Sequence, residues 1–269
     1  ATLRSDSNSE EIRLTMEDDT EIGDVGIDFL SLSLSGNAKL GSASSKYTIE
    51  DENCVLKDKV QLIGTVTYNN SELTLQDNAS VTGELIVTGS GSASRVVMKG
   101  NSAINGKLTC RDDSVSFEMW DNATIDTIDV GISTVYGTVT CTSEIISGVF
   151  EENGTVINNG KITSGIFYGT VSGNGTIEDS ATVDVIFETN GGSAVDTQRI
   201  LRGQKAVTPG YSKKDGYTLE GWYKNDTVYD FTEPVIEGFT LTAQWTANTY
   251  TVSFDSDGGT AVGNKTLGW

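Results

Sequence analysis

The chain has 269 residues, 38 acidic and 18 basic side chains and no histidine, so its net charge is −20. The lack of histidine removes the commonest general base and zinc ligand, and the negative charge opposes binding to nucleic acid or to an anionic membrane surface. No apolar run approaches the roughly 18 residues that a membrane-spanning helix needs, so no direct membrane insertion is expected. Thirty glycines and only two prolines, among many Ser, Thr, Val and Ile residues, favour short strands joined by turns.

The first stretch with strand periodicity is 12–16, where Ile12, Leu14 and Met16 alternate with polar residues. We expect this segment to be a first strand or a cap. A fold made of stacked repeats needs such a cover, because its terminal strands otherwise expose unpaired backbone groups.

A repeat centred on asparagine runs through the first two-thirds of the chain. Positions three residues before and three residues after each asparagine are apolar, and the residue directly after it is small. The asparagines are Asn37, Asn78, Asn101, Asn122, Asn153 and Asn174, with Asn53 as a degraded copy in the long first interval. A period of about 21 residues, with short strand-like segments between, predicts stacked coils. Each coil is expected to bend at its asparagine, which tolerates left-handed backbone geometry.

These coils indicate a mainly β fold, a right-handed parallel β-helix with an N-terminal cap over residues 1–183, stacked at about 4.8 Å per coil. A leucine-rich repeat is an alternative, since Leu32, Leu34 and Asn37 match its L-x-L-x-x-N pattern. That repeat requires an apolar residue two positions after its asparagine, and here that position is filled mostly by polar or small residues such as Lys39 and Ser80. An irregular β-sandwich remains a third alternative.

Three cysteines leave at least one thiol unpaired. Cys110 and Cys141 each lie twelve residues before a repeat asparagine, which predicts that they stack on adjacent coils. In-register parallel neighbours rarely have the dihedral angle that a disulfide needs, and buried thiols suit an apolar core. A reduced pair is therefore favoured over a bridge.

One position of the repeat predicts a ligand-binding site. Two residues before each asparagine the side chain is polar, as in Gln76 and Lys99, except for a tryptophan at Trp120. An exposed tryptophan on a rigid sheet is suited to stacking on a sugar ring or to anchoring a partner. Trp120, Lys99 and Gln76 are therefore the candidate binding residues. The alternative is that Trp120 covers a neighbouring loop.

Catalytic and metal-binding patterns are weak. The cluster Arg111-Asp112-Asp113 could pair carboxylates for acid–base chemistry, but it falls at a predicted turn, where aspartate makes local hydrogen bonds. Asp255-Ser256-Asp257-Gly258 lacks the later glutamate of a calcium-binding EF-hand loop. We expect no catalytic residue, no metal site and no cofactor.

The last third contains a tandem repeat. Val185–Val195 reads VIFETNGGSAV and, 67 residues later, Val252–Val262 reads VSFDSDGGTAV. Between the copies lie, in order, Gly216-Tyr217-Thr218, Gly221-Trp222-Tyr223, Tyr229-Asp230-Phe231, Pro234-Val235 and Leu241-Thr242-Ala243-Gln244-Trp245. This order resembles the Listeria–Bacteroides repeat, the B-repeat of internalin B and of many bacterial surface proteins.

The resemblance implies a small β-grasp-like domain over 184–247 and a truncated second copy over 248–269. Phe187, Tyr217, Trp222, Phe231 and Trp245 are expected to form the core of the first copy, because a small domain relies on aromatic side chains. It also implies an exported protein, at the cell surface or secreted.

Together these patterns predict a monomeric, non-catalytic extracellular protein with an adhesion or glycan-binding module on a repeat stalk. Its partner would be a host or microbial glycan or surface protein, and not nucleic acid. One alternative is a polysaccharide-active β-helix enzyme, a lyase or hydrolase, which would need clustered carboxylates or a bound cation. A purely structural spacer is the other.

Overall fold

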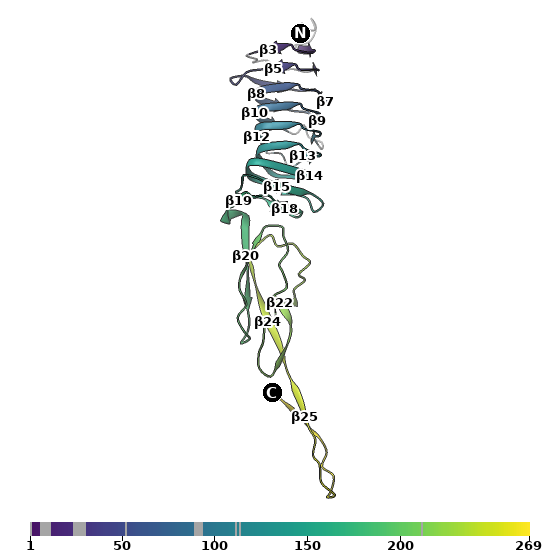
Figure 1. Cartoon of the computed structure of the whole chain (residues 1–269), viewed down its shortest axis with the longest axis vertical. Helices are drawn as coiled ribbons and strands as arrows, with labels where there is room; N and C mark the ends of the chain where they lie inside the picture. Colours follow the sequence, from purple (N-terminus) through teal and green to yellow (C-terminus); the bar gives the residue numbers. More distant parts are fainter. Residues whose placement is uncertain are drawn as a thin grey trace. The chain divides into compact units, whose positions relative to one another are not determined.

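The computed structural model describes residues 2–5, 12–23, 31–51, 53–88, 94–110, 112, 114–210 and 212–269. The chain divides into two compact units (Figure 1). Unit 1 comprises 1–182 together with 201–203, and unit 2 comprises 183–200 together with 204–269.

Unit 1 is a parallel β-solenoid of about eight turns. Its only helix among the described residues is a short 3-10 turn at Asp179–Ala181. β1 pairs antiparallel with β2, and β2 pairs in parallel with β4. Its strands are β1 Thr2–Ser5, β2 Ile12–Met16, β3 Glu21–Ile22, β4 Ser31–Leu34, β5 Lys39–Leu40, β6 Lys46–Ile49, β7 Asn53–Leu56, β8 Gln61–Tyr68, β9 Glu72–Leu75, β10 Ser80–Val87, β11 Arg95–Met98, β12 Ala103–Cys110, β13 Ser116–Met119, β14 Thr124–Phe150, β15 Thr155–Asn158, β16 Lys161–Ile162, β17 Ile166–Phe167, β18 Thr170–Ser172 and β19 Thr176–Ile177. The predicted parallel β-helix is confirmed.

Glycines allow consecutive coils to approach closely at the middle of the long strands. Gly64, Gly83 and Gly106 pair with one another on β8, β10 and β12, and each has a positive φ. A Cβ atom built on Gly106 would lie 1.8 Å from the carbonyl oxygen of Gly83, well inside van der Waals contact. Only glycine fits these three positions without displacing the neighbouring coil.

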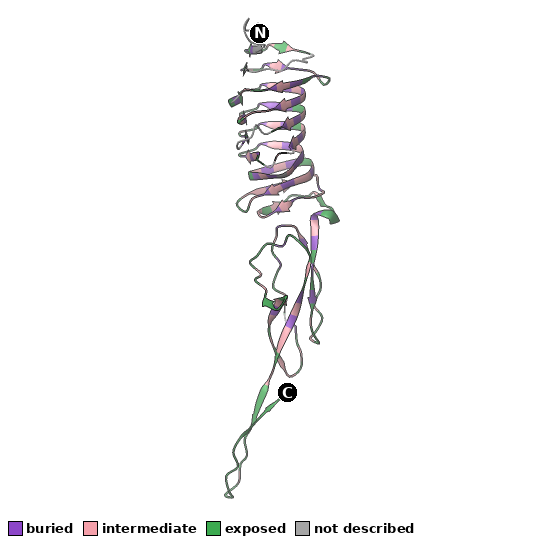
Figure 2. Ribbon diagram, turned by 180° about the vertical axis from the view of Figure 1, so that it is seen from behind, coloured by how far each residue is buried: buried purple, intermediate pink, exposed green. Residues whose placement is uncertain are grey.

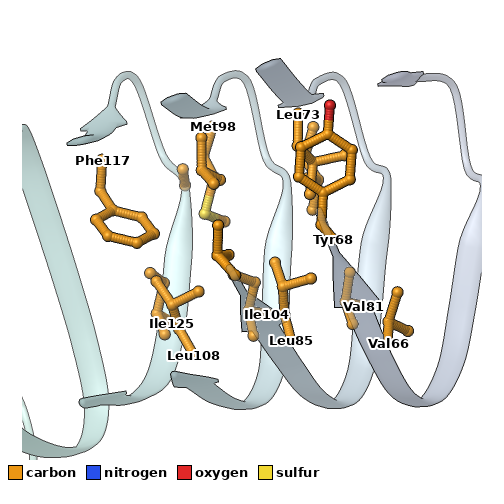
Figure 3. Packing of buried hydrophobic residues seen from close by; sticks show 14 of the residues in the cluster. Val66, Tyr68, Leu73, Val81, Leu85, Met98, Ile104, Leu108, Phe117 and Ile125 are labelled. Carbon is orange, nitrogen blue, oxygen red and sulfur yellow. The ribbon is translucent and has the colours of Figure 1, made fainter. Parts of the chain in front are cut away.

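The core of unit 1 consists of columns of like residues from successive coils (Figures 2 and 3). Val81 of β10 pairs with Ile104 of β12, and Ile104 pairs with Ile125 of β14; all three are buried. The register continues because a slip of one residue would turn every apolar side chain outward. The fully buried Tyr68 keeps its polar end bonded, since its hydroxyl donates to the carbonyl oxygens of Asp51 (2.8 Å) and Glu72 (2.5 Å).

The turns differ in detail from the expectation. The residue in the left-handed region is the one before the asparagine: Asp77, Gly100 and Asp121 have φ of 59°, 67° and 58°. The asparagines instead form a ladder between coils. Asn122 Nδ2 donates to Asn101 Oδ1 (3.2 Å), and Asn101 Nδ2 donates to Asn78 Oδ1 (3.4 Å).

The expected asparagine copy at Asn53 is wrong, because Asn53 begins β7 and pairs with Glu72. The missing copy of the turn is at Asp58-Lys59. Its backbone joins the turns on either side: Lys59 N donates to Gly36 O, and Asn78 N donates to Asp58 O. Lysine replaces asparagine here, so the motif is absent from the sequence although the turn is present.

Coil length is not constant. Val81 pairs with Ile104, 23 residues later, whereas Val156 pairs with Val171, only 15 residues later. This shortening makes the predicted stacking of the two cysteines wrong: Cys110 pairs with Val87, and Cys141 pairs with Asn158 at a different place along the coil. All three cysteines are buried and free. The prediction of reduced thiols is therefore confirmed, but its geometric reason is not.

Unit 2 contains a five-stranded mixed sheet in the order β21-β20-β24-β22-β23. Its core packs Phe187 edge-to-face on Trp222, with ring centroids 5.0 Å apart. Phe231 and Trp245 are partly buried against this core, but Tyr217 lies outside it. The strands are β20 Thr182–Glu188, β21 Gln198–Leu201, β22 Tyr217–Lys224, β23 Thr227–Val228, β24 Phe239–Ala247, β25 Thr249–Val252 and β26 Lys265–Gly268.

The second copy of the repeat forms only a hairpin. β25 pairs antiparallel with β26, and the 67-residue offset places β26 on the equivalent of β21. Phe254 is 45% exposed, whereas its equivalent Phe187 is 6% exposed. The same motif is therefore buried in one copy and open to solvent in the other.

Candidate functional site

The three predicted binding residues lie together at one turn of consecutive coils. Gln76, Lys99 and Trp120 directly follow the paired strand ends Leu75, Met98 and Met119, so they are stacked at about 4.8 Å per coil. Their backbones are joined to the preceding coils; Trp120 N, for example, donates to Met98 O (2.9 Å). The Trp120 side chain is 46% exposed. We name this line of residues the Trp120 column.

The structure adds Lys57 to this column. Lys57 follows Leu56, which pairs with Leu75, so it lies one coil before Gln76. Its side chain is exposed. The irregular spacing around the Asp58-Lys59 turn hides this position in the sequence.

A second exposed aromatic ring lies beside the column. Tyr136 of β14 pairs with Glu118 of β13, two residues before Trp120, and is 42% exposed. Diagonal neighbours of this kind are about 7–8 Å apart, within reach of two aromatic side chains. Alternation around the buried Val135 was the only sequence signal for Tyr136, and the change in coil length obscured it. Trp120 and Tyr136 thus offer two aromatic groups on one rigid sheet.

Charged groups lie on the same face. Arg95 of β11 donates to Glu72 of β9 (2.5 Å) and to Glu118 of β13 (3.0 Å), forming a bridge across three coils. The hydrogen bonds from Arg95 lower the pKa of Glu72. Among the described residues, neither Lys57 nor Lys99 forms an ion pair within 4 Å, although Lys99 is close enough to contribute to the lowered pKa of Glu72.

The covering role considered for Trp120 has a structural basis too. Gly137 pairs with Met119, but the next residue, Thr138, already pairs with Thr155 of the following coil. The coil after Trp120 therefore passes this corner without a counterpart of the four-residue turn 120–123. Trp120 lies at the end of a run of regular turns, where it can meet either solvent or a partner.

Other predicted chemistry is not assembled in the described part of the chain. Arg111 and Asp113 lie outside the described residues, and Asp112 accepts hydrogen bonds from the backbone and hydroxyl of Ser114, as a turn residue does. No group of three or more Cys, Asp or Glu side chains gathers there as a metal site would require. Asp257 N donates to Asp255 Oδ1, which is also a local turn contact.

The sequence missed a cleft of about 630 Å³ in unit 2. It is lined by the segment from Pro209 to Leu219 together with Trp245 and Asn248, apart from Tyr211, which lies outside the described residues. Trp245 was expected only in the core, but its partial burial leaves part of the ring on this cleft.

Comparison with known proteins places unit 2 in a family. Residues 184–244 match the family model described as the Listeria-Bacteroides repeat domain. Two relatives from Evansella cellulosilytica, named provisionally a Gly-rich membrane protein and a membrane protein, are 38% and 39% identical over 82 residues. This match covers 29% of the chain and only 10% and 12% of those relatives.

No solved structure matches the chain. No helix in the described residues is long and apolar enough to cross a membrane. The chain is thus a repeat protein in which residues 184–244 form a Listeria–Bacteroides repeat domain, preceded by a β-solenoid.

Proposed function

We propose that this chain belongs to an extracellular, surface-associated bacterial protein that binds a glycan through the solenoid face around the Trp120 column. The observation that carries the proposal is the pair of exposed rings, Trp120 and Tyr136, on a sheet whose backbone is fixed by the coils on both sides. Rigid aromatic groups bind flat ligands at low entropic cost. The names of the two membrane-protein relatives and the family of unit 2 support a surface location.

The polar side chains around the rings give the face its recognition groups. Gln76 supplies an amide that both donates and accepts, and Lys57 and Lys99 supply N–H donors suited to sugar hydroxyl or acidic groups. The stacked coils place these groups at regular intervals of about 4.8 Å along the solenoid. We infer that the protein acts as a monomer, without cofactor, and that the rest of its acidic surface disfavours nucleic acid.

The enzyme alternative makes a different demand on the same face. Hydrolysis of a glycosidic bond by carboxylates needs two of them roughly 5–9 Å apart, one as acid and one as nucleophile or base. Glu72 and Glu118 flank Arg95, which hydrogen-bonds to both. No observation favours this alternative over binding.

The test is a glycan-array and polysaccharide pull-down screen of the whole chain with two variants, Trp120→Ala and Tyr136→Ala. Ile177→Ala is the matched control, because Ile177 is an equally exposed apolar residue (46%) on another part of the solenoid. We expect binding to be retained in the control and in EDTA and reduced at least tenfold in each aromatic variant. Binding unchanged in both variants would refute the site, and release of shortened sugars would support the enzyme. The absence of any bound glycan would favour the spacer.

A further inference from the structure

The cleft in unit 2 has the build of a second, separate binding site. Its volume of about 630 Å³ lies within the usual range of small-ligand sites. All of its lining residues belong to unit 2, so the site is complete in this unit.

One wall of the cleft is aromatic and firmly held. Trp245 Nε1 donates to Thr189 O (2.9 Å), which fixes the orientation of the indole. The indole also lies against the backbone of Gly192, where an added Cβ atom would be 2.4 Å from the ring. Tyr217 contributes a second ring from the start of β22. A rigid indole beside a phenol presents a flat apolar surface together with polar edges.

The opposite wall carries positive charge in a strongly negative protein. Lys213 and Lys214 line the cleft next to one acid, Asp215. Two hydrogen bonds with Ser193 fix the backbone of Lys213: Lys213 N donates to Ser193 Oγ (2.9 Å), and Ser193 N donates to Lys213 O (2.8 Å).

Lys214 is held at the same wall. Its Nζ donates to Asn190 O (3.1 Å) and lies 4.4 Å from the centroid of the Tyr217 ring. An ammonium group has three donors, so this bond leaves capacity for a ligand. Two adjacent cations with a fixed backbone favour an anionic group at this point.

The two walls together define the ligand. A flat ring surface is suited to the apolar face of a pyranose, and the lysines are suited to a carboxylate on that sugar. We propose that this cleft binds a carboxylated sugar unit, a hexuronate, of an acidic glycan. The site is independent of the solenoid face, so each can be correct without the other.

The four tryptophans allow the two sites to be read separately in one experiment. The whole chain, labelled with ¹⁵N, is titrated with an oligomer of galacturonic acid, and the four indole N–H signals are followed by NMR. Trp245 reports on the cleft, Trp120 on the solenoid face, and the buried Trp222 on any general change. We expect the Trp245 signal to move with saturation, the Trp222 signal to stay, and the shift to weaken as salt is added.

Two further ligands test the chemical class. An uncharged galactose oligomer of equal length tests the requirement for the carboxylate, and hexaglutamate tests whether negative charge alone is sufficient. Neither is expected to move the Trp245 signal. An equal response to hexaglutamate would overturn the assignment to a sugar, and an equal response to the neutral oligomer would overturn the role of the lysines.

Substitutions locate the site without disturbing the core. Lys213 is exposed, so Lys213→Glu should fold normally and weaken binding at least tenfold. Lys205→Glu makes the same charge change in unit 2 away from the cleft and should leave the affinity within twofold. No saturable shift of Trp245 in the unsubstituted chain, or equal loss in both variants, would overturn the proposal. A shift of Trp120 alone would also overturn the cleft and would support the solenoid face.

Discussion

Substitution of Gly106 by alanine tests the close approach of coils on which the solenoid depends. The new Cβ atom would lie 1.8 Å from Gly83 O and 2.8 Å from Gly83 C, whereas ordinary contacts begin near 3.4 Å. Relief requires the two coils to separate by roughly 1.5 Å, about a third of their spacing of about 4.8 Å. This movement would break hydrogen bonds between β10 and β12 at about 1 kcal/mol each, in addition to a backbone strain of about 1–2 kcal/mol at φ +148°. We expect a loss of about 4 kcal/mol in the free energy of unfolding of unit 1.

The matched control is Gly23→Ala, since a Cβ atom there meets nothing within 4 Å. We expect that variant to remain within about 0.5 kcal/mol of the unsubstituted chain. Urea unfolding is followed at the indole signals of Trp120 for unit 1 and Trp222 for unit 2, because a chain of two units need not unfold in one step. Equal midpoints for Gly106→Ala and Gly23→Ala at Trp120 would refute the stacking of Gly106 on Gly83.

Three further outcomes are expected. Phe187→Ala should cost unit 2 about 3–4 kcal/mol, and the equivalent Phe254→Ala less than about 0.5 kcal/mol, in urea unfolding followed at Trp222; equal losses would contradict the open second copy. Asn101→Ala, which removes both of its ladder bonds, should lower the stability of unit 1 by about 1 kcal/mol, and the exposed Asn105→Ala should not. Burial, with a smaller contribution from Asp51, raises the pKa of Cys54 to about 12; the stabilisation is therefore complete below pH 9 and lost as pH rises toward 12. Unfolding midpoints measured across that range should fall more in the native chain than in Cys54→Ala.

The sequence predicted the solenoid because apolar columns leave a periodic record. Apolar residues three positions on either side of Asn78 and Asn101 point into the core, and any shift of register would expose them. The turn itself left a weaker record. Several residue types serve there, so Asp58-Lys59 makes the same bend without asparagine.

The candidate site was predictable only in part, for a related reason. Trp120 was found because it interrupts a polar column, and its neighbours Lys99 and Gln76 were in the correct register. Tyr136 was missed because the coil that carries it is shorter, so counting from the asparagines no longer gives its position. The stacking of Cys141 failed for the same reason. The cleft in unit 2 leaves no periodic signal, since it depends on how a loop lies against Trp245.

The hydrogen bonds between coils in unit 1 run along the direction in which the coils stack, and this has a mechanical consequence. A force that pulls the two ends of unit 1 apart acts on these bonds one coil at a time instead of shearing a whole sheet at once. Each coil of 15 to 23 residues then releases roughly 50 to 80 Å of extended chain as it peels away. A tether built in this way lengthens in small steps under load, and the coils that remain stay folded.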